Sequence, residues 1–325
     1  MNPKMTAMDA ARALGQSEAW VHLKLQEYAL SYSKSQNQIY FGARSAQRIF
    51  QYHFDPKVIA FQIVKGGTGK TSLVYEVAVR ASLYGAKVLC IDMDQQGNLT
   101  NAFNQNAETI PVMVDSLLEG YNLQDCIVNV AERIDLIPSR IENAMLDEAI
   151  RLKKLSLETV YRIPFQHLKS QYDLIIVDCP PSLGQSVAAI ALAADKILAP
   201  VTLEKFAISG LEVTEQSIRE LQENYGIEIS LGIILNKFDA RSLLSQETLQ
   251  RLKRQPKYQN RFLKSFIRLS NEIPNATANN RSIFDVIKST YAKQDVDSLT
   301  QELLEIIPIV VDSGPVSDTV LIPNL

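Results

Sequence analysis

The stretch FQIVKGGTGKTSLV, residues 61–74, decides how this chain folds. An apolar segment runs into a glycine-rich turn, and a second apolar segment follows the turn. A loop that binds phosphate must point its backbone N–H groups at the anion, so side chains must be absent where the chain surrounds the anion. Gly66, Gly67 and Gly69 have no side chains and satisfy this requirement. A helix that begins near Lys70 adds the positive end of its dipole. The stretch therefore predicts a strand, a phosphate-binding loop and a helix, in that order.

The composition is typical of a globular protein. The chain has 325 residues, 46% of them hydrophobic, which is enough for one large α/β domain and a small extra one. No apolar run approaches the ~20 residues of a membrane span, and the N-terminus lacks a signal core. Three widely spaced cysteines (Cys90, Cys126, Cys179) favour reduced thiols in a cytosol. The net charge of −3 means that a polyanion partner needs a local basic patch.

The order of apolar segments predicts two regions. Residues 1–55 carry short helical patterns, whereas strands and helices alternate in residues 56–325. Continuous apolar runs such as LIIVD (174–178) indicate strands buried on both faces. We expect an α/β fold, namely a doubly wound, mainly parallel P-loop NTPase sheet with a small, winged helix-turn-helix-like N-terminal extension. The expected strands are 57–64, 87–92, 134–138, 172–178, 196–202, 229–236 and one near 262–269. The expected helices are 70–84, 141–152, 183–194, 210–225, 245–255, 282–291 and 296–307.

The phosphate loop departs from the ordinary pattern G-x-x-x-x-G-K-[ST] in an informative way. Val64 stands where the first glycine belongs, and Lys65 takes the next position. Within the pattern, Lys70 would reach the β- and γ-phosphates and Thr71 would bind Mg²⁺. The expected nucleotide-binding residues are Gly66, Gly67, Thr68, Gly69, Lys70, Thr71 and Ser72.

KGGTGKT, residues 65–71, resembles the deviant phosphate loop of the ParA/MinD family of dimerising ATPases. The resemblance implies ATP and Mg²⁺ as cofactors and an ATP-bound homodimer. It also implies a catalytic role for Lys65, which would cross the dimer interface and touch the nucleotide phosphates of the partner subunit. The similarity extends over residues 57–307 and includes KILAPVTLEKFAISGLEVTEQSI (196–218), which is similar to the strand and helix at the family's dimer surface.

Two acidic segments extend the resemblance. VLCIDMDQQGNLT (88–100) resembles the family's switch segment, in which Asp92 would support the Mg²⁺ shell and Asp94 would position or deprotonate the attacking water. The family usually has proline where this chain has Gln95, which is a modest departure. YDLIIVDCPPSLG (172–184) is typical of a Walker-B strand, whose Asp178 can hold Mg²⁺ through water.

The segment GIILNKFDAR, residues 232–241, leaves the base open when it is taken alone. Its N-K-x-D tetrad suits guanine, because a carboxylate can accept the N1–H and N2–H₂ donors of that base. Relatives of the ParA type often keep this aspartate while they bind ATP, with the residue at the Asn236 position in contact with adenine. The other motifs favour ATP over GTP.

The segment from Arg241 to Arg268 holds eight basic residues and one acidic residue, Glu247. Such segregation focuses a positive potential on one surface, which suits salt-dependent and sequence-independent DNA binding. Relatives bind DNA through basic residues in this portion, whereas a solvated helix face is the alternative. The expected DNA contacts are Arg251, Lys253, Arg254 and Lys257.

The N-terminal extension has the pattern of a helix-turn-helix. Residues 6–30 contain a short helix, a turn at Gly15, an N-cap at Ser17 and a longer helix. Residues 37–50 follow as a wing and a further helix. Two roles stay open, namely contacts with specific DNA or a second subunit, as in some plasmid ParA proteins, and a cap that packs on the ATPase body.

The resemblance implies a DNA-partitioning ATPase in the cytoplasm of a bacterium or archaeon, associated with the nucleoid. ATP would drive dimerisation and binding to non-specific DNA, and a centromere-binding, ParB-like partner would stimulate hydrolysis. One alternative is the same ATPase with a non-DNA cargo such as an organelle or receptor cluster. Another is a MinD-like membrane-cycling ATPase, which residues 308–325 disfavour because they are acidic and interrupted by proline. No membrane partner is expected.

Overall fold

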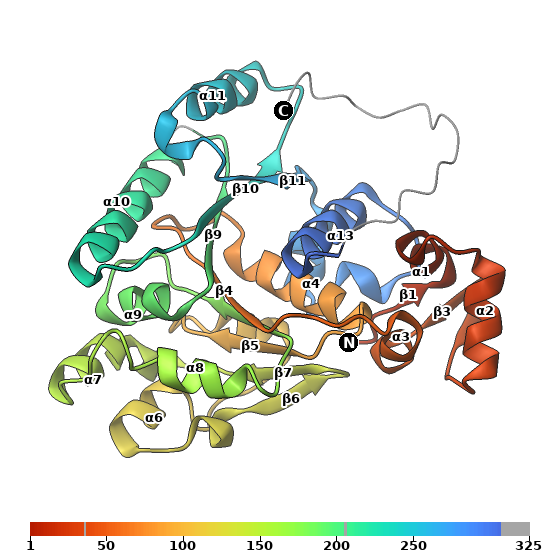
Figure 1. Cartoon of the computed structure of the whole chain (residues 1–325), viewed down its shortest axis with the longest axis horizontal. Coiled ribbons are helices and arrows are strands. Elements are labelled where there is room, and N and C mark those ends of the chain that lie inside the picture. The colour runs from red at the N-terminus through yellow and green to blue at the C-terminus, as the bar shows by residue number, and fades with distance from the viewer. Residues whose placement is uncertain (36, 205–206, 307–325) are drawn as a thin grey trace.

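The computed structural model describes residues 1–35, 37–204 and 207–306, and one large sheet forms its body (Figure 1). The sheet has eight strands in the order β11-β10-β9-β4-β8-β5-β7-β6. Every neighbouring pair is parallel except β6 and β7. The doubly wound, mainly parallel sheet predicted from the sequence is therefore confirmed. Its strands are β4 (Lys57–Phe61), β5 (Val88–Asp92), β6 (Val128–Ala131), β7 (Ile134–Ile137), β8 (Leu174–Asp178), β9 (Lys196–Val201), β10 (Leu231–Phe238) and β11 (Phe262–Arg268).

All seven expected strands are present, and the edge strand β6 is the one that the sequence did not predict. This strand is short and only half-buried, so it lacks the continuous apolar run that marks the central strands. The helices of the body are α4 (Lys70–Leu83), α5 (Asn98–Ala102), α6 (Met113–Glu119), α7 (Leu146–Leu152), α8 (Arg162–Leu168), α9 (Gln185–Ala193), α10 (Ala207–Tyr225), α11 (Leu243–Lys253), α12 (Glu272–Ala278) and α13 (Tyr291–Leu304).

Helices cover both faces of the sheet, and each face has its own hydrophobic core (Figure 1). Alternate residues of β4 enter the two cores: Ile59 and Phe61 pack with α4 and α13, whereas Val58 and Ala60 pack with α9 and α10. Strands buried on both faces need apolar residues at successive positions, which explains the continuous runs in the sequence. Across the described residues, none of the helices combines the length and the apolar character that a membrane crossing requires.

The register of the parallel strands gathers the polar residues of the motifs at one edge of the sheet. In the pairing of β5 with β8, Asp92 lies opposite Asp178. The loop that follows β4 leaves the sheet at the same edge, and α4 begins at Lys70. Ligands of open α/β sheets bind at the carboxyl ends of the strands, where the chain departs to both sides of a central strand. The order of strands around β4 creates such a ligand-binding position at the carboxyl ends of the strands.

The expected helix over 282–291 is wrong. The chain there makes a single 3₁₀ turn, η4 (Ile283–Asp285), and continues in extended form at Val286. Tertiary partners take the backbone groups that a helix would need, because the Glu76 carboxylate accepts from Ile283 N (3.1 Å) and Phe284 O accepts from Lys4 N (2.9 Å). The final helix begins at Tyr291, five residues earlier than expected, and position 307 of the expected helix lies outside the described residues.

The N-terminal extension has the helices, turn and wing that the sequence predicts. Gly15 ends the first helix in the left-handed region (φ 62°), where glycine is favoured, and the Ser17 hydroxyl caps the second helix. A three-stranded antiparallel sheet holds the wing against the N-terminal segment. The elements are β1 (Met5–Thr6), α1 (Ala7–Leu14), α2 (Glu18–Glu27), β2 (Ser33–Ser35), β3 (Gln38–Phe41) and α3 (Ala43–Phe50).

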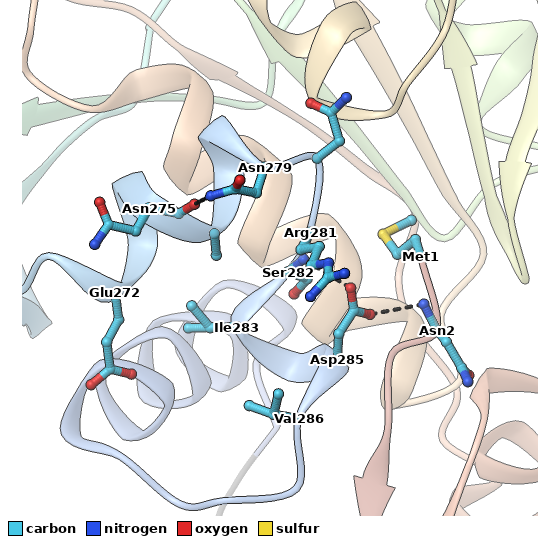
Figure 2. Close-up of a pocket in the computed structure, with 12 residues that line it drawn as sticks. Met1, Asn2, Glu272, Asn275, Asn279, Arg281, Ser282, Ile283, Asp285 and Val286 are labelled. Atoms are coloured by element: carbon cyan, nitrogen blue, oxygen red, sulfur yellow. Dashed lines mark hydrogen bonds between the residues drawn. The ribbon is translucent and has the colours of Figure 1, made fainter.

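The extension packs on the body formed by the large sheet rather than standing apart from it. Its apolar residues join the core that contains α4 and α13. Figure 2 shows Asn2 donating its backbone N–H to Asp285 Oδ1 (2.8 Å), beside a hollow whose other wall is α12. A second contact lies at the start of α3, where Gly42 offers no side chain to cap the helix and Glu132 from the β6–β7 turn accepts from Arg44 N (3.3 Å) instead. Two contacts distant in the sequence therefore anchor the extension.

Two buried ionisable groups lie on α4 beneath this contact. Arg80 is 2% exposed, and its Nε pairs with Asp297 Oδ1 of α13 at 2.6 Å. Glu76 is fully buried and accepts from the Ser282 hydroxyl (2.6 Å) and from Ile283 N. Burial raises the pKa of Glu76 to about 8, although both hydrogen bonds oppose the shift. Glu76 is therefore protonated in the folded protein near neutral pH and ionised in the unfolded chain.

We expect Glu76 to make the fold less stable as the pH rises from about 5 to about 8. In that window the folded state holds a proton that the unfolded chain has lost, so stability falls by about 1 kcal/mol per pH unit. Glu76→Gln mimics the protonated form and should flatten this slope, as measured by urea unfolding at several pH values. Glu148→Gln, on an exposed ion pair, is the control and should leave the slope unchanged. Parallel slopes for wild type and Glu76→Gln would contradict the assignment.

Candidate nucleotide site

The phosphate loop has the backbone that its glycines predict. Gly67 (φ 77°) and Gly69 (φ 88°) occupy the left-handed region, and Gly69 is the N-cap of α4. A Cβ at Gly69 would overlap the side-chain amide of Asn236, so this position requires glycine for space as well as for conformation. The N-terminus of α4 consequently opens toward the loop with Lys70 and Thr71 in its first turn.

A cavity of about 640 Å³ lies beside the loop. The predicted residues on its wall are Gly66, Gly67, Gly69, Lys70, Thr71, Ser72 and Asp94. The structure therefore brings together most of the expected nucleotide-binding set with the residue expected to position water. Thr68 is buried behind the loop, and Lys65 lies outside the wall. Sequence reasoning missed the opposite wall, where Pro274 and Thr277 come from α12, because no motif marks that short helix.

Asn236 and Lys237 both bond to carbonyl groups of the phosphate loop. The Asn236 amide donates to Thr68 O (2.7 Å), and Lys237 Nζ, which lines the cavity, donates to Gly67 O (2.9 Å). These bonds occupy two carbonyl groups of the loop, so its N–H groups remain available to an anion. Asn236 is only 4% exposed and does not belong to the cavity wall, so its expected contact with adenine stays a prediction.

The last residue of the N-K-x-D tetrad has a local partner. Asp239 Oδ1 accepts from the backbone N–H and the Nε of Arg241, both at 3.0 Å. The Arg241 side chain lowers the pKa of Asp239 through these hydrogen bonds. The residues of the tetrad therefore bond to the phosphate loop and, through Asp239, within their own turn. The spacing of the tetrad does not by itself select guanine as the base.

Asp178 is a buried carboxylate with unmet hydrogen-bonding capacity. It is 1% exposed, and neither of its oxygens accepts a hydrogen bond of ordinary geometry within the described residues, although the nearby Thr71 hydroxyl acts to lower its pKa. Burial, reinforced by the charge of Asp92, raises the pKa of Asp178. A buried acceptor without a partner is costly, so a cation at this position would remove the penalty. With Thr71 on the cavity wall, the donor set is the oxygen-rich kind that Mg²⁺ prefers.

Asp92 has a different environment, because protein donors already bond to its oxygens. Thr100 donates its backbone N–H (2.9 Å) and its hydroxyl (2.7 Å) to Oδ2, and Asp94 N lies 3.2 Å from Oδ1. Asp92 thus holds the switch segment in place, and a contribution of Asp92 to the Mg²⁺ shell stays a prediction. Asp94 is 8% exposed and reaches the cavity from the segment that Asp92 holds.

The two lysines of the loop differ in surroundings. Lys70 is buried and donates to Lys65 O (3.4 Å), and burial lowers its pKa while Asp178 opposes the shift. Lys65 is half-buried beside α10, where a Cβ at Gly210 would lie 2.8 Å from the Lys65 Cβ. Thr214 of the same helix accepts from Val64 N (3.0 Å). The helix α10 therefore holds the backbone from which Lys65 projects.

The basic segment proves less uniform than its sequence indicates. Lys257 lies 4.0 Å from Glu215 Oε2 of α10, and Lys253 is half-buried over the ring of Phe262 (5.9 Å). Arg251 and Arg254 are exposed at the end of α11. Counting charges along the segment missed Glu215, which lies outside it in sequence. Of the four expected DNA contacts, the structure leaves Arg251 and Arg254 most accessible.

The fold and this site define a P-loop nucleotide-binding protein of the α/β class. A family model described as an AAA domain matches residues 56–231. The chain is 30% identical over 201 residues to the sporulation initiation inhibitor protein Soj of Bacillus subtilis, covering 61% of this chain and 79% of that protein. It is 30% identical over 265 residues to a virulence plasmid ParA family protein, pGP5-D, of Chlamydia trachomatis, covering 77% and 95% respectively.

A solved structure agrees with these relatives. A putative plasmid partition protein of Borrelia burgdorferi bound to AMPPNP has a TM-score of 0.63 at 24% identity, covering 78% of this chain and all of that one. The chain belongs to the ParA/MinD family of P-loop ATPases, which confirms the resemblance seen in the phosphate loop.

We expect Lys237→Met to weaken binding of both ATP and ADP about tenfold, which is the scale of one lost hydrogen bond from a charged donor. Without the bond, Gly67 O is free to turn inward and the loop loses its shape. Titration calorimetry with each nucleotide measures the effect, and Lys153→Met, on an exposed lysine, serves as the control. Unchanged affinity would show that the loop holds its form without this clamp.

Proposed function

We propose that this protein is an ATP-dependent partitioning ATPase that segregates plasmid or chromosomal DNA. The observation that carries the proposal is the phosphate loop with Lys70 at the start of α4, facing a cavity that also receives Asp94. The plasmid partition protein bound to AMPPNP supports ATP as the nucleotide. The relatives named Soj and ParA support a role in partition. The expected site is cytoplasmic, on the nucleoid.

The residues of the site divide the work of phosphoryl transfer. Backbone N–H groups of the loop and Lys70 bind the β- and γ-phosphates, and Asp94 orients the attacking water. Thr71 and Asp178 would hold Mg²⁺, which when bound neutralises the charge that develops on the phosphate oxygens. The protein forms no covalent bond to the phosphate, so the rate depends on how the water and phosphates are positioned and on how the developing negative charge is stabilised.

The dimer is proposed to form around the nucleotide through Lys65. Its backbone is held by α10, and its side chain lies outside the cavity wall of its own subunit. A cation that does not serve the phosphates of its own subunit is available to those of a second one. Loss of the γ-phosphate would then remove the attraction, separate the subunits and release DNA. A ParB-like partner bound at the cargo would stimulate this step.

Lys65→Ala should stay monomeric in the presence of a non-hydrolysable ATP analogue, under conditions in which the wild type dimerises. Nucleotide affinity should change by less than about threefold, since the lysine serves the other subunit; this corresponds to under 1 kcal/mol. Sedimentation velocity with ADP and with the analogue measures the state, and Lys288→Ala, on an exposed lysine, is the control. Dimerisation of Lys65→Ala with the analogue would refute the role of Lys65.

The DNA contact is proposed to lie on the exposed arginines at the end of α11. Replacing Arg251 and Arg254 by alanine should reduce the slope of log K against log salt by about 2, one for each lost phosphate contact. Fluorescence anisotropy with generic duplex DNA measures the slope. Lys153→Ala, an exposed lysine outside the basic segment, is the control, and its slope should equal that of the wild type. An unaltered slope in the double variant would place the DNA surface elsewhere.

A further inference from the structure

Behind the cavity, five buried polar residues form a connected hydrogen-bond network. They are Asp92, Asp94, Thr100, Ser139 and Asn143, and none is more than 8% exposed. Ser139 lies in the loop after β7, and Asn143 lies in the 3₁₀ helix η2 (Ile141–Met145). Neither belongs to the cavity wall or to the motifs of the sequence. The network joins the segment that carries Asp94 to a separate part of the fold.

The direction of each hydrogen bond at Ser139 follows from its neighbours. Val114 N is a donor only, and it lies 3.2 Å from Asn143 Oδ1, so the amide oxygen faces Val114 and the amide nitrogen faces Ser139. Asn143 Nδ2 then donates to Ser139 Oγ (2.8 Å). The Ser139 hydroxyl is left to donate its own proton to Asp94 O (2.7 Å). The main chain of Asp94 is therefore held by a donor of assigned direction.

The far end of the switch segment is tied to the same residue. Ser139 N donates to Thr100 Oγ1 (2.8 Å), and the Thr100 hydroxyl in turn donates to Asp92 Oδ2. Between these ties Gly97 (φ 61°) passes so close to Ser139 that a Cβ there would lie 3.2 Å from Ser139 O. Ser139 thus contacts the segment at its start, its middle and its end.

We propose that Ser139 and Asn143 are positioning residues for hydrolysis, which hold the backbone of Asp94 so that its carboxylate faces the γ-phosphate side of the cavity. The inference rests on the proposed function, because it takes Asp94 as the residue that orients water. A fully satisfied buried network is rigid in a low dielectric, and a displacement of about 1 Å near the reacting atoms can cost about 100-fold in rate. Ser139 and Asn143 do not line the cavity; they act through Asp94.

Ser139→Ala removes one of two donors to Asp94 O, the other being the backbone N–H of Gly97 (2.9 Å), and leaves the wall of the cavity intact. We expect kcat for ATP hydrolysis to fall about tenfold or more while KM for ATP stays within about twofold, since ground-state binding does not use this bond. Ser82→Ala is the matched control, because Ser82 is equally buried and bonds a backbone carbonyl in α4 (Val79 O, 2.8 Å). It should match wild type in both constants.

Asn143→Asp tests the direction of the hydrogen bond with a side chain of the same shape. A carboxylate there accepts from the Ser139 hydroxyl and so draws its proton away from Asp94 O. The variant should lose kcat as Ser139→Ala does, although the serine is still present. A wild-type kcat in Asn143→Asp at a pH high enough to ionise the new carboxyl would overturn the proposal, because a protonated carboxyl would donate to Ser139 as the amide does. This variant keeps the test available should Ser139→Ala fail to fold.

The Asp94→Ala background separates the inference from the function on which it rests. There, adding Ser139→Ala should change the residual single-turnover rate by less than about twofold, because the carboxylate that Ser139 positions is gone. A further tenfold loss would overturn the inference. If Asp94→Ala by itself hydrolyses ATP normally, the proposed catalytic role of Asp94 fails, and the inference fails with it. If Asp94→Ala is inactive and Ser139→Ala has wild-type kcat, the function stands and the inference falls.

Discussion

A loop can hold a phosphate with its backbone N–H groups only if its carbonyl groups are turned away and bonded elsewhere. In this protein the constraint falls on Gly67 and Thr68, whose carbonyl oxygens accept from Lys237 and Asn236. These two donors stand near the end of β10, two strands away from β4, which leads into the loop. The order and register of the central strands therefore shape the phosphate site as directly as its glycines do. Gly69 is required twice over, by its conformation and by the amide that packs against it.

Helix α4 connects that site to the rest of the molecule. Its first turn carries Lys70 and Thr71, and its later turns carry the buried Glu76 and Arg80. Buried ionisable groups are tolerated only where partners satisfy them, and here the partners come from α13 and from η4. The same partners exclude a helix at 282–291 and receive the N-terminal extension. The extension and the phosphate loop consequently both contact one helix; this packing is compatible with both roles that the sequence left open for the extension.

The sequence predicted the parts of the site whose signal is local. Glycines, a lysine and a hydroxyl in one loop predict an anion site, and apolar runs that end in Asp92 and Asp178 predict carboxylates at the edge of a parallel sheet. The sequence did not predict the wall formed by α12, the bond from Glu215 to the basic segment, or the link from Ser139 to Asp94. Each of these depends on a contact between segments that are far apart along the chain, and no local sequence pattern predicts such a contact.

The sequence by itself determined the seven strands it marked with apolar runs, the phosphate loop and the family. These follow from residue types within a few positions of one another, because backbone freedom and periodicity are local properties. The tertiary structure decided which partner each polar group takes. Asp92 bonds Thr100, whereas Asp178, directly opposite on the next strand, accepts no hydrogen bond of ordinary geometry within the described residues. Strand order and the loops that cross the sheet edge create that difference, so one carboxylate supports the segment after β5 and the other keeps free hydrogen-bonding capacity, which the proposed Mg²⁺ would use.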